Sequence, residues 1–309
     1  MGRKNAFLLA DDLSNKNPDA QKRSQVLQKF ATDLAGLFGC KTDLAYIYNT
    51  PQWVSRNLTL EDAKRIEELE FEKQTKELKN ISVFDRLIVK LGWPIDMLLR
   101  LSKDQRYSAM ILGTKAVHGM DRFFLGSVAE EVARTVKIPL YILGPAVTSS
   151  NYQLESKDLQ LVVATDLTKH SRAAETYAVG IAKKLGAKVH FYYSLKEVAE
   201  SAQKFAYLGG DALPVFDNVL EELKKDAMAA MQKKLDRLKA QGVNCDAHID
   251  SSDVDLLDGV LKLASTPNSL IVMGHQGRGF IAQAFLGSNL RKIISQAKVP
   301  VAVVRSESV

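Results

Sequence analysis

The sequence predicts an α/β protein made of two tandem doubly wound domains, each with a mostly parallel five-stranded sheet. The first observation behind this prediction is a repeat. Gly113 and Gly274 each follow an apolar run and stand 161 positions apart. Pro139 and Pro300 keep the same spacing, which indicates duplication of one folding unit. The second observation is that short β-rich runs alternate with longer helical patterns. This alternation implies right-handed βαβ crossovers and sheets covered on both faces.

The first half contains the expected elements in the order of such a fold. Its first apolar run, 7–12, stops at an aspartate and opens a loop that the polar stretch 14–23 lengthens. Residues 57–80 have the pattern of a long charged helix, and the Gly92–Pro94 turn opens the next crossover. We expect the half to be completed by a strand over 109–112, a helix after 126–127 and a final strand over 138–143.

The second half repeats this order more completely. In its longest helix, apolar residues between Leu220 and Leu238 recur at helical spacing, and Gly242 then marks a helix stop. We expect strands over 160–164, 188–194, 245–249, 269–273 and 299–304, and helices near 170–185, 217–241, 253–265 and 287–297.

The domain organisation follows from the repeat. Polar residues around 146–152 join the halves, which predicts a first domain over 1–150 and a second over 151–309. The final strand of each half is short and apolar, and an unpaired apolar edge favours aggregation. We therefore expect these two strands to pair within one chain, as an internal pseudo-dimer. Further association of the whole chain into a homodimer stays open.

Composition excludes several classes of protein. Apolar residues make up 46% of the chain and charged residues 25%, as in an ordinary globular protein. No apolar run is long enough to span a membrane, and the first residues lack the long apolar region of a signal peptide. The two cysteines form no pattern and favour a reducing compartment. We therefore expect a cytoplasmic protein without a membrane partner.

The formal net charge of +6 raises the question of nucleic acid. In both long helices, however, lysines are interleaved with glutamates, which is typical of a solvated helix face. The sequence has no nucleic-acid-binding signature, and its aromatic residues are not clustered with the basic ones, so we do not expect a nucleic-acid partner. The five histidines show no metal-ligand spacing, and no metal site is predicted.

A glycine loop in the second half has the residue types that a phosphate site needs. Its pattern, Gly274-x2-Gly277-x9-Gly287-Ser288, begins at the carboxyl end of a predicted parallel strand, where open α/β sheets bind ligands. Glycines permit positive φ angles and let the main chain approach a ligand, and Ser288 is a candidate N-cap. Free amides, the helix dipole and this hydroxyl together favour phosphate. Asp166, after the first strand, is expected at the same edge as an acceptor for ribose or base.

The alternative is that the glycines serve only tight turns and helix packing. Because the pattern follows a strand, precedes a helix with a candidate cap and recurs in the chain, we favour an anion or nucleotide site.

This pattern, with Asp166 after the first strand and Val299-Pro300-Val301 before the last, resembles the universal stress protein family. The resemblance is to tandem two-domain members and covers nearly the whole chain. It implies the adenine nucleotide alpha hydrolase-like fold, a role in the stress response, and ATP or AMP bound with any Mg2+ held by the phosphates. The nucleotide-binding residues that it implies are Ala164, Thr165, Asp166, Ser194, Met273, Gly274, Gly277, Gly287, Ser288 and Asn289.

The first half departs from the family pattern. Ala116 replaces the second glycine, and an alanine held at positive φ costs about 1 kcal/mol while placing a methyl group toward the phosphates. The loop after Asp12 is also longer. We therefore expect nucleotide mainly in the second domain. Weaker equivalents in the first domain are Asp12, Gly113, Gly126 and Ser127.

The sequence lacks the further groups that catalysis needs. The loop is not a Walker A sequence, no Gly-x-Ser-x-Gly elbow is present, and no paired carboxylates or Cys/His group accompanies it. We therefore name no catalytic residue and expect at most weak ATP hydrolysis. Three hypotheses stay open: a regulatory nucleotide-binding protein, which we favour, an interaction or scaffold protein with empty sites, and a slow ATPase.

Overall fold

The computed structural model describes residues 5–13, 18–49, 57–77, 81–114, 125–196, 200, 216–250, 254–275 and 286–305. The first half contains, in chain order, β1 (Ala6–Ala10), α1 (Pro18–Phe38), β2 (Lys41–Tyr48), α3 (Leu60–Glu77), the short 3-10 helix Ile81–Val83, β3 (Arg86–Leu91), α4 (Pro94–Leu101), β4 (Tyr107–Gly113), α5 (Ser127–Thr135) and β5 (Leu140–Leu143). The second half contains β6 (Gln160–Ala164), α6 (Arg172–Leu185), β7 (Lys188–Ser194), α8 (Phe216–Lys239), β8 (Cys245–Asp250), α9 (Leu256–Leu263), β9 (Ser269–Gly274), α10 (Ser288–Gln296) and β10 (Val301–Val304).

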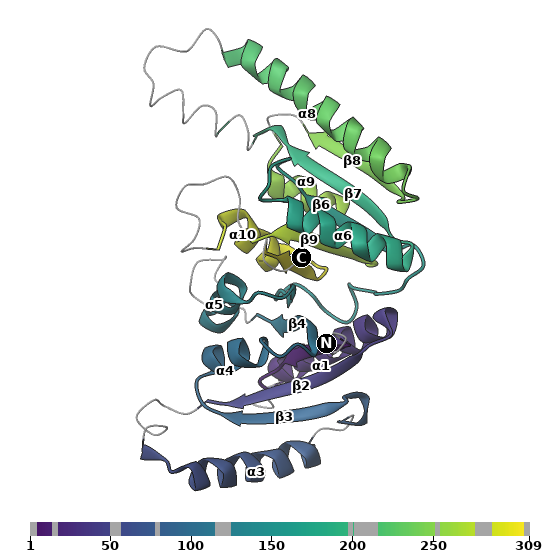
Figure 1. Ribbon diagram of the computed structural model, residues 1–309. Helices are drawn as coiled ribbons and strands as arrows, with labels where there is room; N and C mark the ends of the chain where they lie inside the picture. The colour runs from purple at the N-terminus through teal and green to yellow at the C-terminus, as the bar shows by residue number, and fades with distance from the viewer. Residues whose placement is uncertain are drawn as a thin grey trace.

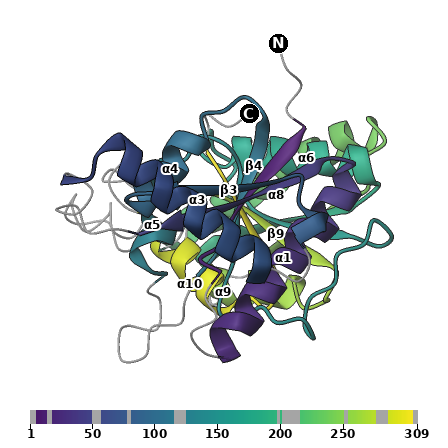
Figure 2. The same cartoon turned by 90° about the horizontal axis from the view of Figure 1, so that it is seen from below.

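The ten strands of the described residues form one sheet, in the order β3-β2-β1-β4-β5-β10-β9-β6-β7-β8. Neighbouring strands within each half are parallel. Figure 1 shows the strands stacked along the molecule, with α3 beyond β3 at one end and α8 beyond β8 at the other. Figure 2 looks along this stack and shows strands crossing at different angles, as the twist of a sheet requires. The predicted α/β class with parallel, doubly wound sheets is confirmed.

The two halves meet at β5 and β10, which pair antiparallel. Tyr141 is opposite Ala302 at the centre of this ladder. On either side of it, Leu140 pairs with Val303 and Ile142 with Val301. Every residue of the two strands is buried, so each strand covers what would otherwise be an unpaired apolar edge. The expected pairing of the final strands, as an internal pseudo-dimer, is confirmed.

Contacts of α10 reinforce this junction. Arg291 of α10 forms an ion pair with Glu130 of α5, with 2.5 Å between Nη2 and Oε1. Gly144, just after β5, lies so close to α10 that an added Cβ would be 1.8 Å from the carbonyl oxygen of Ile294. Only a residue without a side chain fits there, which allows the end of the first half to pass directly against a helix of the second.

Each face of the sheet has its own apolar core. Helices α1, α6 and α8 cover one face, where Phe30 and Ile181 are buried against strand residues such as Phe7. Helices α4, α5, α9 and α10 cover the other face, to which Leu8 contributes. Successive residues of a strand point to opposite faces, so neighbours in β1 serve different cores. Burying one such side chain stabilises the fold by about 1.5–3 kcal/mol. No helix in the described part of the chain combines the length and apolar character needed to cross a bilayer.

Local chemistry explains where several elements begin and end. The helix expected over 57–80 begins only at Leu60, because Thr59 and Asp62 form a capping box: the Asp62 amide donates to the Thr59 hydroxyl at 3.1 Å, and the Thr59 amide to the Asp62 carboxylate at 3.3 Å. Gly242, the predicted stop of α8, has a φ of 76°. The last strand begins at Val301, two residues later than expected, since a proline at position 300 has no amide hydrogen.

A buried carboxylate on β2 fixes the amino ends of the first-half strands. Asp43 is fully buried and accepts hydrogen bonds from Arg106, at 2.7 Å from Nε and 3.0 Å from Nη2. The Tyr107 hydroxyl donates to the same carboxylate at 3.0 Å. Burial and then the nearby Asp43 raise the pKa of Tyr107, so the phenol stays protonated. Because every charge in this group is paired, its burial is tolerated.

Candidate functional site

The carboxyl ends of β6 and β9 meet at one edge of the second-half sheet. The two strands are parallel neighbours, with Val163 opposite Val272. The segment Ala164–Asp166 therefore leaves β6 beside Met273 and Gly274, the last residues of β9. The site residues that the sequence predicted from these two segments are brought together, at the edge where parallel sheets bind ligands.

The two ends of the glycine loop return to the same place. The amide of His275, directly after β9, donates to the carbonyl oxygen of Val304 at 3.3 Å. An ideal Cβ added to Gly287 would lie 3.9 Å from the carbonyl oxygen of His275. The start of α10 therefore lies beside the end of β9. Gly277, predicted as part of this loop, lies outside the described residues.

The prediction that Ser288 caps α10 is wrong. The helix begins at Ser288, the cap position is Gly287, and no described side chain makes the cap hydrogen bond. Gly274 likewise does not use a left-handed conformation, since it is the extended last residue of β9. Ser288 is exposed, and the first amides of a helix have no acceptor within the helix. The capacity to bind an anion therefore rests on main-chain amides rather than on a capping hydroxyl.

Both halves have a strained turn directly after their first strand. Leu167 has a φ of 59° and Leu13 one of 44°, and the two residues are 154 positions apart, as the first strands are. Positive φ is rare for bulky residues, costs about 1–3 kcal/mol and is concentrated at functional sites. The Thr165 hydroxyl accepts the Leu167 amide at 3.0 Å, and the Asp11 carboxylate accepts the Leu13 amide at 3.3 Å. The turn is therefore a shared feature of the two domains.

The side chains that support this turn differ between the halves. In the second half, the buried Thr165 hydroxyl donates to Glu175 of α6, which pairs with Lys234 of α8 at 2.5 Å. In the first half the carboxylate belongs to the residue after the strand rather than to the helix: Asp11 follows β1 and accepts a hydrogen bond from Gln28 of α1 at 3.1 Å. Burial raises the pKa of the Asp11 carboxyl, and the hydrogen bonds that it accepts only partly offset this. The first-half turn thus contains a buried acid that the second half lacks.

Asp166 lies at the turn with its carboxylate oriented by the loop. Its Oδ1 accepts hydrogen bonds from the amide and the hydroxyl of Thr168, at 2.9 Å and 2.8 Å. This is an Asx-type turn, in which an aspartate side chain fixes the backbone two residues on. A carboxylate has about four acceptor positions, so these bonds are compatible with a ligand hydroxyl or amino group as a further donor. The sequence predicted Asp166 at this edge but not the role of Thr168.

The other predicted residues differ in their access to this edge. Ser194 is buried at the end of β7, the strand that follows β6 in the sheet, and lies opposite Asp250 of β8. It shares the edge but stands on the side of β6 away from the glycine loop. Of the remaining residues, Thr165 and Met273 are buried, and Ala164, Asp166, Gly274, Gly287 and Asn289 are half-buried.

The first-domain counterparts are less suited to an anion. Glu130 lies in the first turn of α5, whereas Arg291 occupies the equivalent place in α10. A carboxylate at a helix start interacts with the dipole in the way that a bound anion would, and repels that anion. Gly126, the cap of α5, has a φ of 89°, unlike Gly287, whose φ is −55°. The exposed Asp12 is 3.6 Å from Arg23.

Two further first-domain residues keep the positions of their counterparts. Gly113 ends β4 and Ser127 begins α5, as Gly274 and Ser288 do in the second half. An added Cβ at Gly113 would contact the Leu27 side chain at 3.4 Å. The predicted strain at position 116 falls outside the described residues and stays a prediction.

Sequence spacing did not indicate one group of side chains on β7 and β8. The ligand atoms of His190, Asp246 and His248 all lie within 4.8 Å of one another. The local signal was Asp246-x-His248, because alternate residues of a strand point to the same face. His190 is far from them in the chain and is brought opposite Asp246 by the register of the two strands.

Comparison with known proteins agrees with this architecture. The model of the Universal stress protein family matches the chain twice, over residues 19–144 and 160–305. Both matches lie inside the two predicted domains, whose boundaries at 150 and 151 stay predictions. A universal stress protein from Thermus aquaticus is 28% identical over 153 residues, which cover 47% of this chain and 97% of that protein. That relative therefore corresponds in length to one half of the chain.

Solved structures resemble the whole chain. A universal stress protein from Archaeoglobus fulgidus DSM 4304 aligns with a TM-score of 0.66 and 21% identity, covering 98% of this chain and 97% of that one. A functionally unknown protein from Pseudomonas aeruginosa PAO1 aligns with a TM-score of 0.55 and 12% identity, covering 97% and 92%. At these identities the likeness shows the fold, while the family model matches both halves by sequence. The chain belongs to the universal stress protein family, as a member with two family domains in tandem.

Proposed function

We propose that this protein is a regulatory protein of the stress response that binds an adenine nucleotide, ATP or AMP, mainly in its second domain. The observation that carries the proposal is the closeness of His275 and Gly287, which places the start of α10 beside the end of β9. The strained turn at Leu167 follows β6, the neighbouring strand. The helix start supplies amides for phosphate, and Asp166 in the turn supplies an acceptor for the nucleoside.

The charge at the start of α10 suits a phosphate group. Its first turn, all of which is described, contains no acidic residue. Arg291 follows Leu290, but its charge is paired with Glu130 of α5, so the attraction of phosphate rests on the helix start itself. The helix dipole contributes about 0.3–1 kcal/mol to an anion at such a site, in addition to hydrogen bonds from the free amides. Mg2+ prefers oxygen ligands and water, so it would be held mainly by the phosphates of the nucleotide.

The same reasoning favours the second domain over the first. The first turn of α5 carries Glu130, and a carboxylate there opposes a phosphate, although the ion pair with Arg291 offsets part of this charge. The turn after β1 also holds the buried Asp11, where the second domain has the neutral Thr165. Two acidic side chains near the phosphate and nucleoside segments therefore reduce the affinity of the first domain for an anionic ligand.

Equilibrium dialysis of the full chain with labelled ATP, and separately with labelled AMP, tests the proposal. We expect about one nucleotide per chain, weaker binding after Asp166→Ala, and little change after Asp12→Ala, the matched substitution in the first domain. Absence of binding for both nucleotides would contradict the proposal and favour an interaction or scaffold protein with empty sites. Product analysis after long incubation separates a binding protein from a slow ATPase.

The location and association of the chain are part of the same proposal. Cys40 and Cys245 are free thiols, which suits the reducing conditions of the cytoplasm. The junction of β5 and β10 already covers the strand edges of both halves. We propose that this pair of domains within one chain is the functional unit. Sedimentation analysis with and without ATP tests whether the whole chain associates further.

A further inference from the structure

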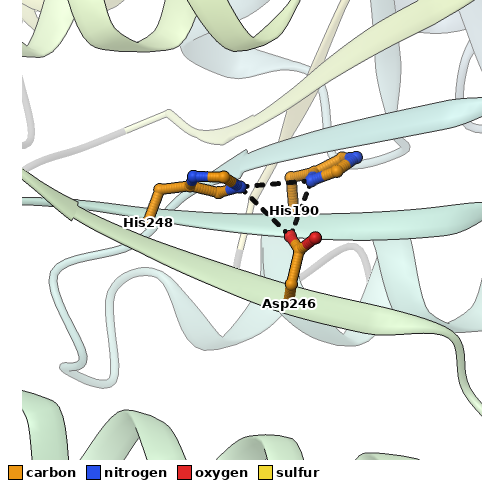
Figure 3. Close-up of side chains that lie close together, drawn as sticks. All are labelled: His190, Asp246 and His248. Carbon is orange, nitrogen blue, oxygen red and sulfur yellow. Dashed lines mark hydrogen bonds and ion pairs between the residues drawn. The ribbon is translucent and has the colours of Figure 1, made fainter.

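Three side chains with metal-ligating atoms converge on one face of β7 and β8. His190 lies on β7 directly opposite Asp246 of β8, and His248 follows two residues later on the same face of β8. Figure 3 shows the two imidazole rings and the carboxylate turned toward one another above these strands. The group therefore does not depend on a loop: all three positions are fixed by the pairing of two strands.

The spacing of the ligand atoms is close to that of a tetrahedral metal site. Nε2 of His248 is 3.4 Å from Nδ1 of His190 and 3.2 Å from Oδ1 of Asp246. Two ligands of a tetrahedral Zn2+, each about 2.0–2.1 Å from the metal, are about 3.3 Å apart. Only the distance between His190 Nδ1 and Asp246 Oδ1, now 2.6 Å, has to lengthen when a metal replaces that contact.

The neighbouring side chains orient these atoms for a cation. The side-chain oxygen of Gln160 faces Nε2 of His190, and Oδ1 of Asp246 faces Nδ1 at 2.6 Å, a contact that contains one hydrogen. When a metal ion replaces that hydrogen, Nδ1 and Oδ1 both direct lone pairs at the ion, and Nε2 carries the ring hydrogen and donates it to Gln160. Metal-binding histidines commonly donate their second ring nitrogen to an oxygen acceptor in this way.

The surroundings of the group leave room for an ion to enter. The His190 side chain is 13% exposed, whereas those of Asp246 and His248 are 36% and 39% exposed. Lys188 contacts the other carboxylate oxygen of Asp246 at 2.7 Å. This leaves Oδ1 directed at the histidines, although the positive charge of Lys188 lowers the affinity for a cation.

The first half fills the corresponding place in a different way. The register of the strands makes Asp43 the counterpart of His190, because both lie opposite equivalent positions of their first strands. There the guanidinium of Arg106 supplies the positive charge at the amino ends of the strands. The position equivalent to Arg106 is Pro267, 161 residues later, so the second half has no guanidinium there, and Lys188 is the cation that contacts Asp246.

We propose that His190, Asp246 and His248 bind one divalent transition-metal ion, with Zn2+ as the reference ion and water in the fourth position. Two imidazoles and one carboxylate suit Zn2+ and related ions better than Mg2+ or Ca2+, which prefer oxygen ligands. The ion joins β8, the edge strand of the sheet, to β7 and stabilises that edge. Gln160 begins β6 whereas the nucleotide segment follows its end, roughly 13 Å away along the strand. The ion is therefore distinct from any Mg2+ on a nucleotide.

Calorimetric titration of the full, tag-free chain with Zn2+, in the absence of nucleotide, tests the site. We expect one equivalent to bind and the melting temperature of the chain to rise, because binding to the folded state stabilises it. Co2+ in place of Zn2+ gives a visible d–d spectrum typical of four- or five-coordination. Gln160→Ala keeps all three ligands and should weaken binding by about 10–100-fold, the usual effect of losing an outer hydrogen-bond partner.

Ligand and control variants decide the outcome. His248→Ala, at the more exposed position, should fold normally and lose the Co2+ spectrum, and Lys188→Met should bind Zn2+ more tightly. His170→Ala and Cys245→Ala, which alter a histidine and a thiol outside the group, should leave binding unchanged. Absence of a stoichiometric site, or equal affinity in the chain with and without His248→Ala, would overturn the proposal. Loss of binding in Cys245→Ala alone would assign the ion to the thiol and overturn it too.

Discussion

Tyr141 and Ala302 pair at the centre of the ladder between β5 and β10, and they are also equivalent positions of the repeat, 161 residues apart. An approximate two-fold axis therefore passes between them. Arg291 and Glu130 are 161 positions apart as well, and they meet across this axis as an ion pair. In a symmetric dimer of identical chains, equivalent residues that meet at the axis carry the same charge. The tandem chain allows opposite charges there, which makes the junction specific for its own two halves.

Substitution of the two tyrosines at this junction should have unequal effects. The hydroxyls of Tyr141 and Tyr177 are 2.7 Å apart. Burial raises the pKa of Tyr177 to about 12 and that of Tyr141 well above its usual value, so both phenols stay protonated. Tyr177→Phe leaves the fully buried Tyr141 hydroxyl without a partner and should lower the free energy of unfolding by about 1–3 kcal/mol. Tyr141→Phe leaves the hydroxyl of Tyr177, a residue that is half-buried rather than fully buried, and should cost less.

Urea denaturation of the two single variants and the double variant measures this difference. The double variant should be no less stable than Tyr177→Phe, because it removes the unpaired hydroxyl together with its partner. Equal losses for both single variants that add in the double variant would show that the hydrogen bond contributes nothing specific to the junction.

Gly126 and Gly287 hold equivalent positions but should respond differently to alanine. Gly126 has a φ of 89° and no described atom within 4 Å of an added Cβ, so among the described residues Gly126→Ala meets the conformational cost, about 1–3 kcal/mol. Gly287 has a φ of −55°, and of the described atoms its new methyl group would approach the His275 carbonyl oxygen, at 3.9 Å. Gly287→Ala should therefore change the free energy of unfolding by less than about 0.5 kcal/mol. A larger loss for Gly287→Ala than for Gly126→Ala in urea would contradict this.

Asp11→Asn should stabilise the protein at neutral pH. Burial raises the pKa of Asp11 above its ordinary value of 3.8. At pH values between 3.8 and this higher folded-state pKa, the folded state therefore binds more protons than the unfolded state. Stability at this group is consequently present at low pH and is lost as the pH rises through the folded-state pKa. An asparagine carries no charge to bury, and Gln28 can rotate its amide to accept from it.

The pH dependence of unfolding distinguishes this effect from a general change. The advantage of Asp11→Asn over the unmodified chain should be small near pH 4 and should grow toward pH 7, as measured by urea midpoints. Asp12→Asn, a matched change at an exposed neighbour, should show no such growth. An Asp11→Asn variant that is less stable at pH 7 than at pH 4, relative to the unmodified chain, would indicate that the ionised carboxylate is needed.

The arrangement of strands and helices was predictable because it depends on local patterns and on the repeat. The strand expected over 188–194 is found with those bounds, and the pairing of the final strands followed from the need to cover apolar edges. The cap of α10 was not predictable in this way. In a Gly-Ser pair, the serine can be either the N-cap or the first residue of the helix. Only the backbone geometry shows that Gly287 is the N-cap and Ser288 the first helical residue.

Contacts across the sheet were beyond reach of the sequence for a physical reason. Asp43 and Arg106, or His190 and Asp246, are far apart in the chain and meet only through strand register. A shift of one residue would turn either side chain to the opposite face. The glycine loop was expected from a local run of residue types, but residues 276–285 lie outside the described residues and its binding of nucleotide stays a prediction. The histidine group could not be predicted, since its geometry comes from two strands separated by a helix.

Nucleotide should bind the second domain first. Gly277→Ala, which imitates the first half, should weaken ATP binding without lowering the melting temperature, because we expect a methyl group at this position of the motif to lie toward the phosphates. Ala116→Gly alone should add little binding to the first domain, since Glu130 remains at the start of α5. Dialysis with labelled ATP measures both effects. Equal occupancy of the two domains in the unmodified chain would show that neither difference matters for binding.

Hydrolysis of bound ATP should be slow or absent. Amides at the start of α10 stabilise phosphate in the ground state, and binding that is equal in ground and transition states does not accelerate a chemical step. Within the described residues at the edge of β6 and β9, the one carboxylate predicted to contact nucleotide is Asp166, and Thr168 already occupies its Oδ1. Asp166→Ala should therefore lower the affinity for ATP, and Ser288→Ala, which keeps the main-chain amides, should lower it less. Both should leave the low rate of phosphate release from saturated protein nearly unchanged. A kcat near that of a median enzyme, about 10 per second, which falls sharply in Asp166→Ala, would instead assign a catalytic role to this carboxylate.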